Sequence, residues 1–240
     1  MDRYIDMHCH ILPGVDDGAQ NLEETRQMLQ IAFNEGTRLI IATPHHHPRR
    51  GHKRPEILNK QLRLVRAEAA KISDKFRIYL GTEVFFGQDV PEKINRGEIL
   101  TMNKRNTVLL EFSPSDSYDY IRQGVQQVQM TGNQVIIAHA ERYQCLLDDI
   151  GYAEELCDMG ASIQVNAGSI IGDGGRRAKR FVKELMDEDM VFGVGTDAHG
   201  VQTRAPKMKK AADYVKKKYG EEYMRRIFFD NAATLLRKRK

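Results

Sequence analysis

The chain has 240 residues, of which 41% are hydrophobic and 29% charged, a composition that excludes disordered, collagen-like and disulfide-rich proteins. Thirty-seven basic and 33 acidic residues give a net charge of +4, too small to demand a nucleic-acid partner, and residues 238–240 carry much of it. No stretch approaches the ~20 apolar residues of a membrane span, so we expect a cytoplasmic protein without membrane insertion. The three cysteines indicate free thiols.

Seven short apolar runs, each followed by polar residues and then by a stretch with helical spacing, predict buried strands that alternate with helices. The runs are Tyr4 to His8, Arg38 to Thr43, Arg77 to Thr82, Thr107 to Phe112, Gln134 to His139, Ala161 to Asn166 and Met190 to Thr196. Such alternation predicts an α/β fold with a parallel sheet that closes, or nearly closes, into a β/α barrel. Because no low-complexity linker divides the chain, we expect a single domain over residues 1–240.

Helix signals lie between these runs. Asn21, with Glu24 three residues later, is typical of a capping box, and Gly36 is expected to end that helix. Pro55 is typical of a first helical turn. The stretch that it opens has a single apolar face, formed by Leu58, Leu62, Val65, Ala69 and Ile72. The glycine-rich residues 172–175 predict a loop that leads into the helix after the sixth strand.

The C-terminal part, residues 205–236, predicts two or three helices with interruptions at Gly220 and at Asp230-Asn231. Its basic stretches, Lys207 to Lys210 and Lys216 to Lys218, indicate solvated helix faces more than a nucleic-acid track.

Groups suited to metal binding follow every predicted strand. They are His8 and His10, His45 to His47, Glu83, Glu111, His139, Asn166, and Asp197 with His199. The C-terminal ends of barrel strands converge on one rim, so these side chains are expected to gather there. A single histidine is more often a satisfied core or surface residue, but this many at one rim favour a metal site. Imidazoles and carboxylates without thiolates suit Mn²⁺, Fe or Zn²⁺ in a catalytic site, and the number of groups predicts more than one ion.

The His8-Cys9-His10 triplet places both imidazoles on one face of a strand and Cys9 on the other, because strand side chains alternate. Asp16 and Asp17 lie in a glycine-flanked loop just beyond, where a turn that bonds its own backbone is the alternative to a ligand role.

Arg142 and Arg204 follow His139 and His199 by three and five residues. A guanidinium above the rim could hold an anionic substrate through a bidentate fork, and a solvated surface charge is the alternative.

Together these segments resemble the polymerase-and-histidinol-phosphatase (PHP) superfamily, and within it the bacterial metal-dependent protein-tyrosine phosphatases associated with capsule and exopolysaccharide synthesis. The resemblance covers nearly the whole chain and rests on Asp6 to Ala19, Thr43 to His45, Gly81 to Glu83, Ile137 to Tyr143 and Thr196 to His199. It implies a distorted seven-stranded, TIM-like β/α barrel with three divalent ions, Mn first and Fe, Zn or Mg as alternatives.

The resemblance also implies residue roles. One ion would be held by His8, His10, Glu83 and Asp197, and Glu83 would bridge to a second ion bound by His45 and His139. Asp17 and His199 would serve the third ion, while Arg142 and Arg204 would contact the phosphate. Glu111 and Asn166 are expected only to support the site. His46, His47 and His52 match no ligand position.

The function implied is hydrolysis of phosphotyrosine on the tail of a bacterial tyrosine autokinase that controls polysaccharide synthesis. One alternative is a histidinol phosphate phosphatase with the same ions and a smaller substrate. A nucleic-acid-processing module is a further alternative, which the nearly balanced charge disfavours. The general acid, the cognate kinase and the oligomeric state stay open at this point.

Overall fold

All pairings between the nine strands found in residues 3–236, the part that this computed structural model describes, are parallel. The strands are β1 (Tyr4–Cys9), β2 (Thr37–Ala42), β3 (His45–His46), β4 (Arg77–Leu80), β5 (Glu83–Phe85), β6 (Thr107–Glu111), β7 (Gln134–Ile137), β8 (Ser162–Asn166) and β9 (Val191–Gly195). They form a three-stranded sheet, β1-β2-β4, and a six-stranded sheet, β3-β5-β6-β7-β8-β9. The predicted parallel α/β fold is confirmed, but these strands form two sheets, and no single closed barrel is found among them.

Two of the predicted strands are broken by a bend. The second run stops at Ala42, and the third stops at Leu80, three residues before Glu83. Each then continues in the other sheet, as β3 and β5, and the Gly81 N–H still bonds the Ala42 carbonyl at 2.8 Å. A Cβ at Gly81 would lie 2.6 Å from the sulfur and 3.2 Å from the Cα of Met102, so a larger residue there would displace Met102. The expectation that Glu83 ends the third strand is therefore wrong, since it begins β5.

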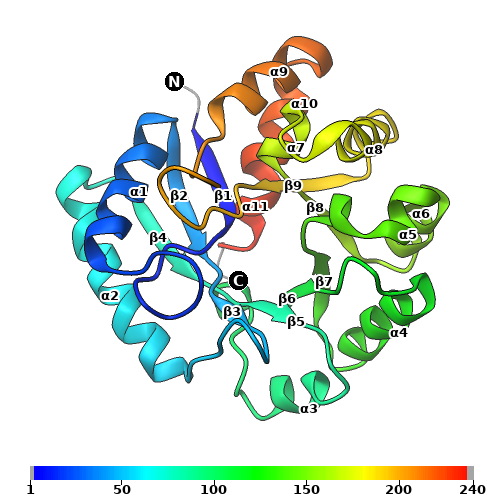
Figure 1. Cartoon of the computed structure of the whole chain (residues 1–240), viewed down its shortest axis with the longest axis horizontal. Helices are drawn as coiled ribbons and strands as arrows, with labels where there is room; N and C mark the ends of the chain where they lie inside the picture. Colours follow the sequence, from blue (N-terminus) through cyan, green and yellow to red (C-terminus); the bar gives the residue numbers. More distant parts are fainter. Residues whose placement is uncertain (1–2, 237–240) are drawn as a thin grey trace.

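Helices surround the two sheets on the outside (Figure 1). The longer helices are α1 (Leu22–Asn34), α2 (Pro55–Ile72), α4 (Tyr118–Gln129), α6 (Gly151–Asp158), α8 (Gly175–Asp187) and α9 (Lys209–Tyr219). The shorter elements are α3 (Val90–Asn95), η1 (Met102–Lys104), η2 (Ala140–Arg142), α5 (Gln144–Asp148), α7 (Ala167–Ile171), α10 (Glu221–Arg225), η3 (Arg226–Asp230) and α11 (Asn231–Thr234).

Local signals account for several helix boundaries. The Asn21 side chain accepts the Glu24 N–H at 3.0 Å and so caps α1, and Pro55 stands in the first turn of α2, as predicted. Gly220 separates α9 from α10, also as predicted. The predicted interruption at Asp230-Asn231 is wrong, because η3, a π-helical turn, passes directly into α11 there.

Apolar side chains from both sheets pack together beneath the rim, and the C-terminal segment closes this cluster. Its members include Ile5, Met7, Ile41, Leu109, Ile136, Ala232 and Leu235. Burying such side chains contributes roughly 1.5–3 kcal/mol each, which makes the strand framework rigid beneath the polar rim.

The three cysteines are free thiols, as expected. Among residues 3–236, every helix is too short or too polar to cross a bilayer. The basic tail at residues 238–240 lies outside the described residues.

Candidate metal centre

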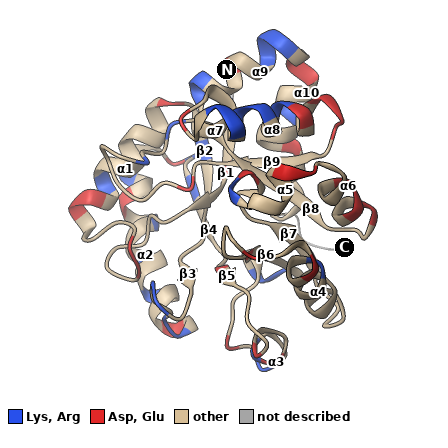
Figure 2. Cartoon of the chain, turned by 45° about the vertical axis from the view of Figure 1, so that its right-hand side comes forward, with Lys and Arg blue, Asp and Glu red and all other residues tan. Residues whose placement is uncertain are grey.

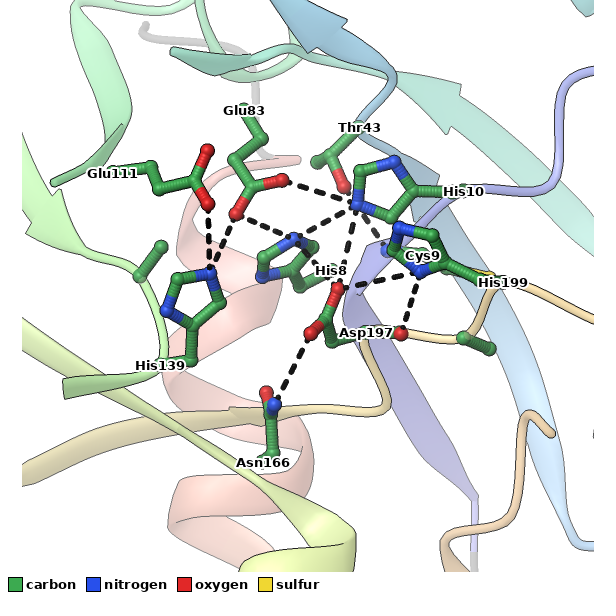
Figure 3. A network of polar contacts seen from close by, with 12 residues as sticks. His8, Cys9, His10, Thr43, Glu83, Glu111, His139, Asn166, Asp197 and His199 are labelled. Carbon is green, nitrogen blue, oxygen red and sulfur yellow. Dashed lines mark hydrogen bonds and ion pairs between the residues drawn. The ribbon is translucent and has the colours of Figure 1, made fainter. Parts of the chain in front are cut away.

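His8 and His10 project from the end of β1 to the same side, so that their Nε2 atoms lie 3.2 Å apart (Figure 3). Cys9 between them is buried in the apolar cluster under α1 and α2. Two carboxylates meet this pair, that of Glu83 on β5 and that of Asp197 just after β9. The His8 Nε2 lies 3.3 Å from Glu83 Oε1, and both histidines lie 3.5 Å from Asp197 Oδ1. Three segments far apart in the sequence thus contribute to one point.

Glu83 is the centre of the cluster and is completely buried. Its carboxylate lies 3.1 Å from His10 Nε2, 3.0 Å from His45 Nδ1 and 2.8 Å from His139 Nε2. Burial alone would raise the pKa of Glu83, but the charge of His8 and the surrounding imidazole hydrogen bonds hold it well below its usual range. The carboxylate is therefore ionised and available as a ligand.

Asp17, His45 and His199 form the outer part of the site. Asp17 Oδ1 lies 3.1 Å from His45 Nε2 and 3.4 Å from His199 Nε2, and the Asp17 side chain is half exposed. The close contacts with the imidazoles of His199 and His45 lower the pKa of Asp17. Asp17 stands at the open side of the cluster.

Three overlapping groups of side chains bring their ligand atoms close enough together to hold an ion. They are His8, His10, Glu83 and Asp197; His45, Glu83 and Glu111; and His10, Asp17, His45 and His199. All eight residues that the sequence suggested as ligands lie at this rim. His139 lies in none of the three groups, although it contacts Glu83 directly.

The chemistry of these atoms fits divalent ions. Within residues 3–236, several buried ligand atoms have no hydrogen-bond partner although carboxylates or imidazoles surround them. They are both ring nitrogens of His45, Oε2 of Glu83, Oε2 of Glu111, Oδ1 of Asp197 and Nε2 of His199. A buried polar atom without a partner is costly, and lone pairs that converge without hydrogen-bond geometry are what a cation would satisfy. The donor set fits Mn²⁺, Fe, Zn²⁺ or Mg²⁺, none of which needs thiolate.

Glu111 is more central than the sequence indicated. It ends β6, and its oxygens lie 3.7 Å from His139 Nε2 and 3.8 Å from His45 Nδ1. Burial and the nearby charge of Glu83 raise the pKa of Glu111 to about 7. Two buried carboxylates this close repel each other, and a cation between them would remove that repulsion.

Polar side chains behind the ligands orient the imidazoles. Asp16 Oδ2 lies 2.9 Å from His10 Nδ1 and accepts the His45 backbone N–H at 2.9 Å. Asp16 Oδ1 also accepts the Gly18 N–H at 3.0 Å, so the turn interpretation of Asp16 is confirmed, and the same carboxylate contacts His10, a candidate ligand. Gln164, which sequence reasoning missed, accepts the His139 N–H at 2.8 Å and lies 3.1 Å from His8 Nδ1. The signal for it was a polar residue inside the apolar run of β8.

Arg142 and Arg204 flank the cluster on the Asp197 side. Their Nη2 atoms lie 2.5 Å and 2.6 Å from Asp197 Oδ2, and Asn166 Nδ2 donates to the same oxygen at 3.3 Å. Both arginines also line a cavity of about 950 Å³ that opens beside the site. Each guanidinium is only partly buried, so donors remain for a ligand in the cavity.

His46, His47 and His52, which sequence reasoning left unassigned, lie outside the three ligand groups. The His46 and His52 rings pack against each other with centroids 5.5 Å apart. His47 Nδ1 instead accepts backbone N–H groups from the turn that follows it.

Comparison with known proteins places this site in a family. The family model described as "Capsular polysaccharide synthesis, CpsB/CapC" matches residues 4–237. The chain belongs to the CpsB/CapC family. It is 32% identical to the tyrosine-protein phosphatase CpsB of Streptococcus pneumoniae over 237 residues, which cover 97% of this chain and 98% of that protein. It is 30% identical to the tyrosine-protein phosphatase YwqE of Bacillus subtilis, with 97% and 91% covered.

A solved structure supports the same family. One of the crystal structures of YwqE from Bacillus subtilis and CpsB from Streptococcus pneumoniae, described as unique metal-dependent tyrosine phosphatases, matches with a TM-score of 0.89. It is 29% identical in sequence, and the match covers 97% of this chain and 94% of that one. The resemblance found in the sequence is thereby confirmed at the level of the family.

Proposed function

We propose that this CpsB/CapC protein is a metal-dependent protein-tyrosine phosphatase that acts on a bacterial tyrosine kinase in capsule or exopolysaccharide synthesis. One observation carries the proposal: Asp197 lies in a candidate ion group with His8 and His10, and it also contacts the two arginines that line the cavity. A phosphate in that cavity would meet cations on both sides. The relatives named tyrosine-protein phosphatases support the choice of substrate.

The ligand assignment is part of the proposal. His8, His10, Glu83 and Asp197 would hold one ion. Glu83 would be shared with a second ion, held also by His45, His139 and Glu111. Asp17 and His199 would serve a third, together with the histidines that they contact. Manganese is our first choice of metal, with iron, zinc or magnesium as alternatives.

When bound, divalent ions lower the pKa of coordinated water and offset negative charge on phosphoryl oxygens. The chain's own groups bind and orient the substrate. Arg142 and Arg204 would hold the phosphate through charge-assisted hydrogen bonds, with Asp197 fixing the spacing of the two guanidinium groups. Asp16 and Gln164 hold the rings of His10 and His8.

The chemistry of the leaving group also favours phosphotyrosine over phosphoserine as the substrate. A phenolate has a pKa of ~10, so it departs more easily than a serine alkoxide and depends less on a general acid. The cavity of about 950 Å³ is large enough for a phosphotyrosyl side chain and neighbouring peptide.

We extend the proposal to the setting of the protein. The chain would work as one domain in the cytoplasm, on the tail of a kinase and without nucleic acid. Lys and Arg lie on the outer helices α8 and α9 (Figure 2), where several are paired with acidic neighbours, such as Lys183 with Asp187 and Lys209 with Asp213. Counting β2 with β3 and β4 with β5 as bent strands reduces nine strands to seven, which favours a distorted seven-stranded barrel.

A comparison of substrates tests the function. Full-length protein purified without chelator should hydrolyse a phosphotyrosine peptide far better than histidinol phosphate, and elemental analysis should find divalent metal. A preference for histidinol phosphate would refute the assignment. The His139→Ala variant should lose activity and metal while its circular dichroism stays unchanged, whereas the matched surface variant His52→Ala should retain all three.

A further inference from the structure

The turn between β3 and α2 is held in one shape by His47. Its Nδ1 accepts the backbone N–H groups of Arg49 at 2.9 Å and of Arg50 at 3.1 Å. His47 and Gly51 also exchange two backbone hydrogen bonds of 2.9 and 3.2 Å. The imidazole is 8% exposed and packs on the Phe85 ring at 4.3 Å. The third histidine of the run, which the ligand groups leave out, is thus the internal support of this turn.

The same turn rests on the loop that carries the acidic pair of the metal centre. Gly51 has φ +117°, and a Cβ there would lie 3.2 Å from the Val15 carbonyl oxygen and 3.7 Å from Asp16 Cα. Only glycine combines that backbone conformation with so close an approach. The turn is therefore fixed relative to the ions' ligands and is not a free loop.

This turn delivers a guanidinium to the metal centre. Arg50 Nη1 lies 3.2 Å from Glu111 Oε1, and Glu111 in turn contacts His45 and His139. The Arg50 side chain is 42% exposed, and Glu111 is the one ion-pair partner found for it in residues 3–236, so N–H donors of the guanidinium remain for a ligand. An ion held by Glu111 would compensate the charge of that carboxylate, which leaves the guanidinium able to pair with another anion.

We propose that Arg50 is a third substrate-binding arginine, which contacts an anionic group of the phosphotyrosine substrate beside Glu111, whereas Arg142 and Arg204 stand beside Asp197. His47 is the positioning residue that holds it there. The inference rests on the proposed function for the identity of the substrate. The anionic group is either the phosphoryl group itself or a carboxylate beside the phosphotyrosine, and the two sources can be separated by experiment.

The neighbouring Arg49 offers a matched control, because it is an exposed arginine on the same turn, and no ion pair of its side chain is found in residues 3–236. Calorimetry with inorganic phosphate on the metal-loaded full chain is the first measurement. Arg50→Gln should weaken phosphate binding about 10- to 100-fold, as expected for loss of a charge-assisted hydrogen bond, and Arg49→Gln should change it less than about twofold. The phosphate affinity of Arg50→Lys should lie between those of the wild type and Arg50→Gln, since lysine keeps the positive charge but cannot form two parallel hydrogen bonds.

The second measurement uses KM for two phosphotyrosine peptides of equal length, one with acidic residues beside the tyrosine and one with neutral residues. If phosphate binding is unchanged and Arg50→Gln raises KM only for the acidic peptide, the contact is with a carboxylate of the substrate. The positioning role of His47 predicts that His47→Leu reproduces the Arg50→Gln effect, while His47→Asn, whose Oδ1 can replace Nδ1 as acceptor, restores binding.

Two results would overturn the proposal. In the first, the phosphate affinity and both KM values of Arg50→Gln match those of Arg49→Gln. In the second, Arg50→Gln loses metal, which would make Arg50 only a partner of Glu111. Phosphate binding is read without turnover. A wild-type protein that binds phosphate through Arg50 yet fails to hydrolyse phosphotyrosine would therefore refute the proposed function and not this site.

Discussion

Replacing Gln164 with leucine tests whether the polar groups behind the ligands set metal affinity. Gln164 is fully buried on β8, and its Oε1 meets both His8 Nδ1 at 3.1 Å and the His139 N–H at 2.8 Å. An oxygen at that place accepts a hydrogen bond from Nδ1–H, so the proton stays on Nδ1 and the lone pair of His8 Nε2 faces Glu83. Leucine keeps the volume and removes this control of the tautomer.

The expected magnitudes follow from these contacts. Loss of a group that orients a ligand lowers metal affinity about 10- to 100-fold, or about 1.4 to 2.8 kcal/mol. The substitution removes three hydrogen bonds, one of them from Gln164 Nε2 to Asn166 Oδ1 at 3.0 Å, and leaves the buried His139 N–H without a partner. It should destabilise the ion-free fold by about 2–3 kcal/mol and lower Tm by roughly 4–12 °C.

The assay is calorimetric titration of Mn²⁺ into chelator-treated full-length protein, with thermal melting followed by circular dichroism. Gln134→Leu is the matched control, since Gln134 also lies on a strand but is exposed, and it should bind metal like the wild type. Wild-type metal affinity in Gln164→Leu with an intact fold would show that the contact to His8 does not orient a ligand.

Three further outcomes follow from the site. Arg142→Gln should raise KM for a phosphotyrosine peptide at least tenfold with metal content retained, and loss of metal in that variant would contradict the phosphate role. Metal binding should release protons, because neighbouring carboxylates outweigh burial and raise the pKa of His45 to about 9 in the ion-free protein, so His45 is protonated at pH 7. Metal affinity should therefore increase as pH rises toward about 9, and titrations in buffers of different ionisation enthalpy would detect the protons. Chelation should lower Tm, with about 2.7 kcal/mol of stabilisation regained at free metal 100 times its Kd, and an unchanged melting curve would argue against bound ions.

Continuous apolar runs and the helical period of 3.6 residues carried most of the fold prediction. The apolar runs became buried strands because both faces of a parallel sheet are covered, and the predicted apolar face of α2 places Leu58, Leu62 and Val65 in the core. The bends after Ala42 and Leu80 could not be read in the same way, because they depend on Gly81 passing the sulfur of Met102, a contact between distant segments. Local pattern likewise could not show that η3 continues into α11 across Asp230.

For the site, the sequence predicted which types of residue gather at the rim but not which side chains contact one another. His8 and His10 could be paired because strand geometry fixes their common face. Gln164 and Asp16 could not be linked to these histidines, because the contacts join β8 and a loop to β1 across the rim. Arg50 was missed for a similar reason: its partner Glu111 lies 61 residues away, and the turn that brings them together depends on a buried imidazole.

Because the backbone at the rim is strained, even exactly predicted strand boundaries would not have predicted where the side chains of the site lie. His139, Asp197 and Arg204 have positive φ values of 31°, 51° and 50°, a region that costs non-glycine residues on the order of 1 kcal/mol or more. Each is held by a long-range or loop hydrogen bond: His139 N–H to Gln164, Asp197 N–H to the His8 carbonyl at 2.7 Å, and the Arg204 carbonyl to His199 N–H at 2.9 Å. Relaxing these residues to ordinary strand or helix geometry would displace two candidate ligands, His139 and Asp197, and one of the two arginines beside them, Arg204. The packed sheets therefore hold three residues in unfavourable backbone conformations. The free energy that these conformations cost is needed to bring the candidate metal ligands and the guanidinium groups together.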